Sequence, residues 1–121
     1  MDKYLALEKR LAELLGYRDI FRLKVDGVEH GGLHYNKSTF TGGEKVPRWT
    51  RDWSACGPLM AEHGLATQVQ NELHTAQVST VDGPIVLRIE RFADHPDKDT
   101  AVRYAIVQAV IAKLESERGK A

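Results

Sequence analysis

Apolar residues near the N-terminus recur at intervals of three and four, which is the spacing of one face of a helix. The residues on this face are Tyr4, Leu7, Leu11, Leu14 and Leu15. Gly16 follows where a glycine commonly ends a helix in the left-handed conformation. The spacing therefore predicts an amphipathic helix from about residue 3 to residue 15.

A short alternating segment follows, at residues 21–25, and it leads into Asp26-Gly27, a favoured hairpin turn pair. This pattern predicts a short strand or hairpin. Beyond it the chain is rich in glycine and has few regularly spaced apolar residues, so we expect a long loop over about residues 26–48. A loop of that length in a compact domain is typical of a functional or a disordered segment.

The middle of the chain predicts a second helix that ends at Gly64. Thr50 or Asp52 is positioned to cap it. Its expected buried face consists of Trp53, Cys56, Leu59 and Met60. Pro58 would remove a backbone donor inside this helix, so a later start, with Ser54 as the cap, is the alternative.

After Leu65 the apolar period changes from helical to two, and residues 67–73, 75–81 and 85–92 are predicted strands. The turn at residues 81–84 contains Asp-Gly-Pro and favours an antiparallel connection between the last two. In the third strand Ile85, Leu87 and Ile89 share one face, which we expect to point to the core.

The final helix is predicted from about residue 101 to residue 117, with Asp99 or Thr100 as its cap. Its apolar side is wide enough to pack on the sheet and against another helix. The apolar positions are Val102, Tyr104, Ala105, Ile106, Val107, Ala109, Val110, Ile111 and Leu114. A charged tail at about residues 116–121 is expected to fray.

These elements predict an α+β protein in the order helix, loop, helix, three-strand meander, helix. Helices would pack with the small antiparallel sheet as a helix–sheet–helix sandwich. A length of 121 residues is that of one ordinary domain, so we expect residues 1–121 to form a single domain.

The composition of the chain limits the kinds of partner and the cellular location that we expect. The chain has 17 Lys and Arg residues and 17 Asp and Glu residues, so its net charge is zero and an extended nucleic-acid partner is not expected. It has a single cysteine, no signal-peptide pattern, and no apolar run near the roughly 20 residues that cross a bilayer. We therefore expect a soluble cytoplasmic protein with no membrane partner.

Three segments carry a resemblance to a known family. Leu15-Gly16-Tyr17 is followed by Pro47-Arg48-Trp49-Thr50-Arg51-Asp52-Trp53, and the Ala-rich helix of residues 101–114 closes the chain. This order resembles the phage ABA-sandwich family of small phage and prophage proteins, with the NinX-like proteins as looser relatives. Arg51 separates the Thr and Asp that are adjacent in that family. The resemblance implies a bacteriophage or prophage origin, a bacterial host cell and the sandwich fold, but no catalytic residues.

The tryptophan segment has two interpretations. Trp49 and Trp53 lie four residues apart with Arg48 and Arg51 between and beside them, so exposed rings would stack on a nucleotide while the arginines bind phosphate. Alternatively, Trp53 enters the core and Trp49 packs ahead of the helix as a hydrophobic staple. Arg48, Trp49 and Arg51 are thus the candidate ligand-binding residues.

Other candidate chemistry is weaker. Cys56 and His63 are two helical turns apart, about 10 Å, which is too far for a catalytic hydrogen bond. The histidines near residues 30–34 and at residue 95 have solvated-loop interpretations, so no metal or other cofactor is expected. We expect a protein that is not an enzyme and acts by binding a protein partner, or by forming a homo-oligomer. A small-ligand or nucleotide-binding module that uses Arg48, Trp49 and Arg51 is the alternative.

Overall fold

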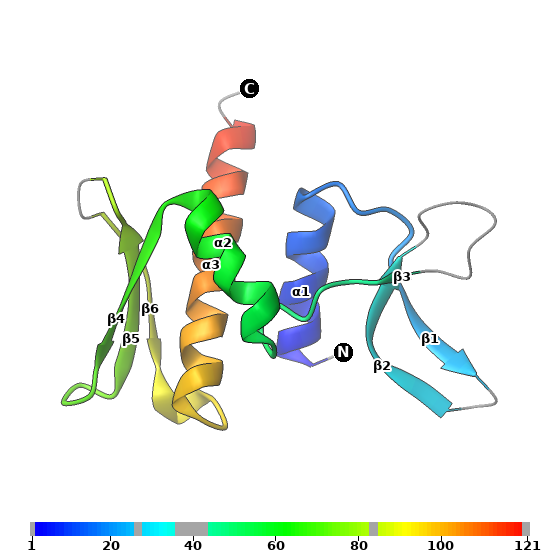
Figure 1. Ribbon diagram of the computed structural model, residues 1–121, viewed down its shortest axis with the longest axis horizontal. Coiled ribbons are helices and arrows are strands. Elements are labelled where there is room, and N and C mark those ends of the chain that lie inside the picture. The colour runs from blue at the N-terminus through cyan, green and yellow to red at the C-terminus, as the bar shows by residue number, and fades with distance from the viewer. Residues whose placement is uncertain (1, 26–27, 36–43, 83–84, 120–121) are drawn as a thin grey trace. The chain divides into compact units, whose positions relative to one another are not determined.

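The computed structural model describes residues 2–25, 28–35, 44–82 and 85–119 of the chain (Figure 1). The contacts divide the chain into two compact units, Met1–Arg48 and Trp49–Ala121. The described residues contain three α-helices and two three-stranded antiparallel sheets, which confirms the predicted α+β class. The expectation that residues 1–121 form one domain stays a prediction.

The first unit begins with helix α1, Lys3–Leu14, which confirms the predicted helix. The carboxylate of Asp2 caps it by accepting a hydrogen bond of 2.8 Å from the backbone N–H of Leu5. Leu11 and Ala12 are fully buried on its apolar face. Gly16 then adopts a φ of 94°, which suits a residue without a side chain, and turns the chain toward the first sheet.

The first sheet has the strand order β1, β2, β3. These strands span Phe21–Val25, Val28–Tyr35 and Glu44–Lys45, and α1 contacts β2. Val25 pairs with Val28, so the predicted hairpin is confirmed by its strands, although Asp26 and Gly27 lie outside the described residues.

The loop predicted over residues 26–48 is wrong at 28–35 and 44–45, which are strands. Residues 36–43 of that loop lie outside the described part of the chain. Gly31 and Gly32 weaken the strand pattern in the sequence, but β2 hydrogen-bonds to strands on both sides. Leu33 and His34 are buried in it, so pairing and burial outweigh the low strand propensity of glycine.

The second unit begins with helix α2, Trp53–His63. The Asp52 carboxylate accepts hydrogen bonds from the backbone N–H of Ser54, at 3.0 Å, and from its hydroxyl, at 2.8 Å. Asp52 is therefore the cap, and the alternative start with Ser54 as the cap is wrong because the helix accommodates Pro58 in its interior. Gly64 ends the helix in the left-handed conformation, with a φ of 62°.

Strands β4, Leu65–Gln70, β5, Thr75–Thr80, and β6, Val86–Arg91, form the predicted meander. Val78 pairs with Arg88 but the next residue, Ser79, pairs with Val86, so Leu87 is the extra residue of a β-bulge. The bulge reverses the alternation beyond it. The predicted core face of Ile85, Leu87 and Ile89 is therefore wrong, because Ile85 and Ile89 are exposed while Leu87 alone is half-buried.

Helix α3, Lys98–Gly119, begins three residues before its predicted start. The Asp97 carboxylate accepts a 2.7 Å hydrogen bond from the backbone N–H of Thr100, so Asp97 is the cap and the predictions of Asp99 or Thr100 are wrong. The helix continues through most of the predicted tail, and residues 120–121 lie outside the described part.

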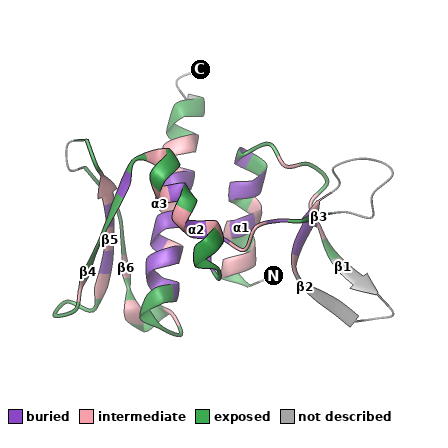
Figure 2. Cartoon of the chain, in the orientation of Figure 1, coloured by how far each residue is buried: buried purple, intermediate pink, exposed green. Residues whose placement is uncertain are grey.

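Burial in the second unit centres on α3, which is buried almost continuously from Thr100 to Ile111 (Figure 2). It packs mainly on β5 and β6, and α2 packs against it as well. This confirms the prediction that the final helix contacts both the sheet and another helix. An apolar helix buried on several sides therefore forms the core of the unit.

Candidate functional site

The structure buries Trp49, as in the staple interpretation, but contradicts the predicted core position of Trp53. Trp49 is only 4% exposed, whereas Trp53, at the first position of α2, is 41% exposed. Trp49 therefore does not present its ring for stacking, and Trp53 does not enter the core. Arg48 is half-buried and Arg51 is exposed. The predicted nucleotide site built on Arg48, Trp49 and Arg51 thus lacks the exposed ring on which it depended.

Trp53 instead lies against a buried arginine from α3. The Arg103 guanidinium carbon is 5.2 Å from the centre of the Trp53 ring, within the range of a cation–π contact. Arg103 also donates a hydrogen bond from Nε to the Thr50 carbonyl oxygen, at 3.0 Å, and another to the Thr100 hydroxyl, at 3.3 Å. These contacts join the residues before α2 to α3, so Arg103 has a structural role in the second unit.

Cys56 lies on the buried side of α2, as predicted. Its Sγ is 4.0 Å from the backbone carbonyl oxygen of Arg103. Burial raises the pKa of the thiol to about 12, although the nearby Arg103 opposes this shift. The thiolate is the nucleophilic form of cysteine, so this thiol is unsuited to nucleophilic catalysis at neutral pH.

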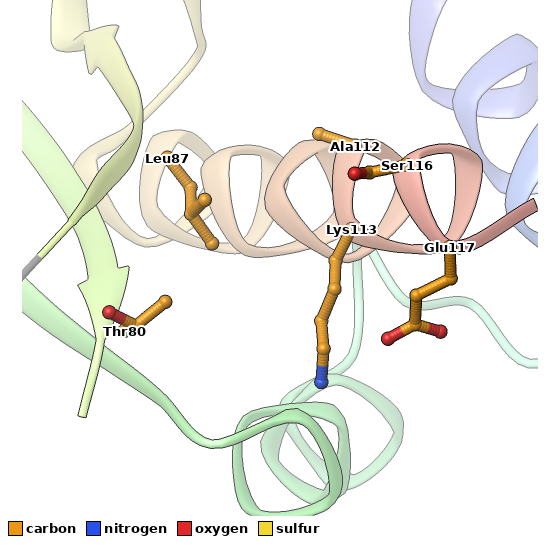
Figure 3. A pocket seen from close by; sticks show the side chains of 6 residues that line it. All are labelled: Thr80, Leu87, Ala112, Lys113, Ser116 and Glu117. Atoms are coloured by element: carbon orange, nitrogen blue, oxygen red, sulfur yellow. The ribbon is translucent and has the colours of Figure 1, made fainter. Parts of the chain in front are cut away.

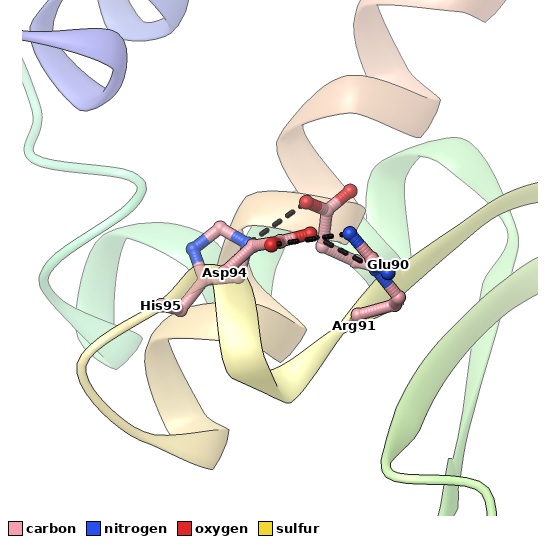
Figure 4. A network of polar contacts seen from close by, with 4 residues as sticks. All are labelled: Glu90, Arg91, Asp94 and His95. Carbon is pink, nitrogen blue, oxygen red and sulfur yellow. Dashed lines mark hydrogen bonds and ion pairs between the residues drawn. The ribbon is translucent and has the colours of Figure 1, made fainter.

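A second polar cluster joins β6 to α3 through the 3₁₀ turn η1, Phe92–Asp94 (Figure 4). His95 Nε2 is 2.9 Å from Glu90 Oε1, and the His95 side chain has no exposed surface. The His95 ring lies 4.8 Å from that of Tyr104, whose pKa is raised by burial and by the charge of Glu90. These side-chain contacts therefore link β6 to α3 across the η1 turn.

A cavity of about 310 Å³ lies beside the C-terminal half of α3 (Figure 3). Its lining residues are Thr80, Leu87, Ala112, Lys113, Ser116 and Glu117. Lys113 Nζ donates a hydrogen bond of 3.3 Å to the backbone carbonyl oxygen of His63, at the end of α2. Burial and the Lys113 charge lower the pKa of His63. The cavity offers an amine, a carboxylate and two hydroxyls around an apolar floor.

The face of the β4–β5–β6 sheet that points away from α3 is the third candidate. Ala76 and Val78 point toward the core, so strand alternation and the register assign the opposite face. We call this the outer face, and its residues are Ala66, Gln68, Gln70, Thr75, Gln77, Ser79, Val86, Ile89 and Arg91. Val86 is 47% and Ile89 is 55% exposed. Of the outer-face residues, only Arg91 carries a charge.

The sequence does indicate this face, through the distribution of its charged residues and not through the spacing of its apolar residues. Residues 65–81 include a single Asp, Glu, Lys or Arg, which is Glu72, although 28% of the whole chain is charged. A strand with a solvated face normally alternates apolar and charged or polar residues. The outward positions of β4 and β5 follow this rule mostly with neutral polar residues, so this face is nearly free of charge.

Among the described residues, no three His, Cys, Asp or Glu side chains lie close enough to hold a metal ion together. The helices in the described ranges also lack the combination of length and apolar character that a membrane span requires. No protein-family model matches the sequence, and no curated protein or solved structure is significantly similar to it.

Proposed function

We propose that this chain acts by binding rather than catalysis, and that it binds a protein partner through the outer face of the β4–β5–β6 sheet. The observation that carries the proposal is the near absence of charge on this face, together with the exposure of Val86 and Ile89. The buried centres of protein interfaces are depleted in charged residues. Grouped exposed apolar residues on a soluble domain commonly mark an interaction site.

A capture experiment with matched variants tests this proposal. The tagged chain is incubated with an extract of the cells that carry its gene, and the retained proteins are quantified for the wild type, Ile89→Glu and Leu73→Glu. Leu73 is 67% exposed but lies in the turn between β4 and β5, so it controls for the added charge. A partner retained by Leu73→Glu and lost with Ile89→Glu supports the proposal. Partners that both variants retain equally would contradict it.

The proposed setting is a bacteriophage or prophage, with the protein acting in the cytoplasm of a bacterial host. The support is the resemblance of residues 47–53 and 101–114 to the phage ABA-sandwich family. The gene's neighbourhood tests this directly. Capsid or early-region phage genes beside it would agree with the proposal, and a housekeeping operon would overturn it.

A small ligand in the α3 cavity is the second candidate function. The cavity volume of about 310 Å³ is at the lower end of the range of small-molecule sites, and its lining mixes charged, hydroxyl and apolar groups. Thermal shift measurements with a panel of small amino and carboxylic acids test this candidate. Leu87→Trp would fill the cavity and abolish any ligand-dependent shift, whereas Ile89→Trp, on the opposite face, would preserve it. An equal response of both variants would exclude the cavity.

A further inference from the structure

The two edges of the β4–β5–β6 sheet differ in how they are protected. The β6 edge carries the bulge at Leu87 and three charged residues, Arg88, Glu90 and Arg91. Bulges and charges on an edge strand are the devices that prevent it from pairing with other strands. The β4 edge has an uninterrupted register with β5, and its six residues, Leu65–Gln70, include no charge, proline or glycine. It lacks these protections.

The backbone of β4 is oriented so that it can accept another strand. The Val81 N–H donates a 2.9 Å hydrogen bond to the Gly64 carbonyl oxygen, so these two residues form a hydrogen-bonded pair. In an antiparallel ladder such pairs alternate with pairs whose N–H and C=O groups point outward. Leu65, Thr67 and Val69 therefore direct these groups away from β5. In the described part of the chain, β5 is the strand that pairs with β4.

The side-chain surface beside this edge is open at Val69, whereas Leu65 at the other end of the strand is buried. The register with β5 places Val69 opposite Ala76, on the face toward α3. Because α3 packs mainly on β5 and β6, Val69 is left 44% exposed. An apolar side chain and a row of outward backbone groups thus lie along the same strand.

We propose that β4 pairs antiparallel with β4 of a second copy of this chain, with the two-fold axis at Thr67. Each Thr67 then lies opposite Thr67 of the other copy, and each Leu65 opposite Val69. The three residues whose backbone groups point outward all pair in this register, with about six hydrogen bonds in total. The result is a continuous six-stranded sheet.

A second copy is the occupant because the strand is complementary to itself. Leu65 and Val69, whose backbone groups point outward, lie at equal distances on either side of Thr67. If the two-fold axis moved to residue 66 or 68, one of the three outward-pointing residues would lie opposite a residue outside β4. Self-pairing also places identical residues together, which a charged strand would resist, but β4 has no charge. The net charge of the chain is zero, so no long-range repulsion opposes association. This inference goes beyond the proposed function, since it holds whether or not the outer face binds a partner.

Proline substitution tests the backbone pairing. Analytical ultracentrifugation of the wild type should show a concentration-dependent rise from the monomer mass of 13.6 kDa toward twice that value. Thr67→Pro removes an N–H that points away from β5, a position where edge strands tolerate proline. It should weaken the dimer about tenfold or more, because hydrogen bonds at the axis are lost. Thr67→Val keeps the N–H and should dimerise like the wild type.

Charge substitution tests the register. Thr67→Lys and Thr67→Glu should each be monomeric, because like charges would lie directly opposite one another. An equimolar mixture of the two should recover a dimer, since opposite charges then meet at the axis. Leu73→Lys, which adds the same charge outside the paired residues, should leave dimerisation unchanged. Circular dichroism of each variant checks that the fold is kept.

Three outcomes would overturn the proposal. One is a wild type that stays at 13.6 kDa up to concentrations on the order of 1 mM, which would exclude even a weak dimer. Another is a dimer that Thr67→Pro leaves unchanged, which would place the contact elsewhere. The third is a mixture of the Lys and Glu variants that remains monomeric, which would exclude the axis at Thr67.

Discussion

Replacement of Arg103 should destabilise the second unit far more than replacement of an exposed arginine. Arg103 is 9% exposed and hydrogen-bonds to two neutral acceptors, the Thr50 carbonyl and the Thr100 hydroxyl. In Arg103→Met the carbonyl of Thr50, a fully buried residue, loses this donor. A hydrogen bond from a charged donor contributes about 1.5–3 kcal/mol, and the cation–π contact with Trp53 adds about 0.5–1 kcal/mol. We expect a loss of about 3 kcal/mol in the free energy of unfolding.

Arg91→Met is the matched control. Arg91 pairs with Asp94 at 3.2 Å, but its side chain is 74% exposed, so the pair is screened by water. Its loss should cost less than about 1 kcal/mol. Urea unfolding followed by tryptophan fluorescence is the assay, because Trp49 and Trp53 both belong to the second unit. Equal destabilisation by the two substitutions would refute the argument that burial, and not the presence of a carboxylate partner, determines the contribution of an arginine.

Three further predictions follow from single contacts. Cys56, buried and with its pKa raised to about 12, should react with iodoacetamide at pH 8 only after unfolding, and rapid labelling of the native chain would contradict this. Asp52→Ala should lower the unfolding free energy by about 1 kcal/mol in the same urea assay, while Asp52→Asn, which still caps, should lower it much less. The backbone N–H and then the hydroxyl of Thr100 hold the pKa of Asp97 below its usual 3.8. The stabilisation from Asp97 is therefore complete above pH 3.8 and is lost as the pH falls through the lower pKa of the folded state. The free energy of unfolding of Asp97→Asn should accordingly depend less on pH in this acid range than that of the wild type.

The helices were predictable because their signal is local. Apolar spacing located all three within a few residues, since each helix satisfies its own backbone hydrogen bonds and buries one continuous stripe. Their caps were less predictable. Asp97, Asp99 and Thr100 are all residue types that cap helices. Asp97 is the cap because α3 begins at the residue after it, and this start depends on the path of the chain after the η1 turn.

The strand faces depended on contacts that the sequence does not show. The alternation of Ile85, Leu87 and Ile89 indicated a core face, but the bulge at Leu87 turns Glu90 inward instead. An inward carboxylate is costly unless it has a partner, and here the buried His95 supplies one at 2.9 Å. That partner is five residues away, in the segment between η1 and α3. The sequence pattern alone therefore favoured the simpler and wrong assignment.

The core position predicted for Trp53 was wrong for a similar reason. Asp52 fixes the start of α2, which makes Trp53 its first residue and leaves its ring half-exposed. The contact that then holds this ring comes from Arg103, fifty residues later in the chain. Spacing within residues 47–59 carries no information on such a partner. A prediction limited to that segment could identify the helix start, but it could not identify which ring would be buried.

The two proposals for the β4–β5–β6 sheet are linked by geometry. Pairing of two β4 edges about an axis perpendicular to the sheet keeps both outer faces on the same side. The two outer faces, on each of which Arg91 carries the one charge, would then be continuous across the dimer, with Gln68 of each copy next to Ala66 of the other. A partner that spans the axis contacts both copies, so its affinity should rise with the dimer fraction and fall with Thr67→Pro. A partner that binds within one outer face would be indifferent to that substitution. The partner affinity should therefore be measured for Thr67→Pro and Thr67→Val. A lower affinity of Thr67→Pro alone indicates a binding surface formed by both copies, and equal affinities indicate a binding surface that lies within one copy.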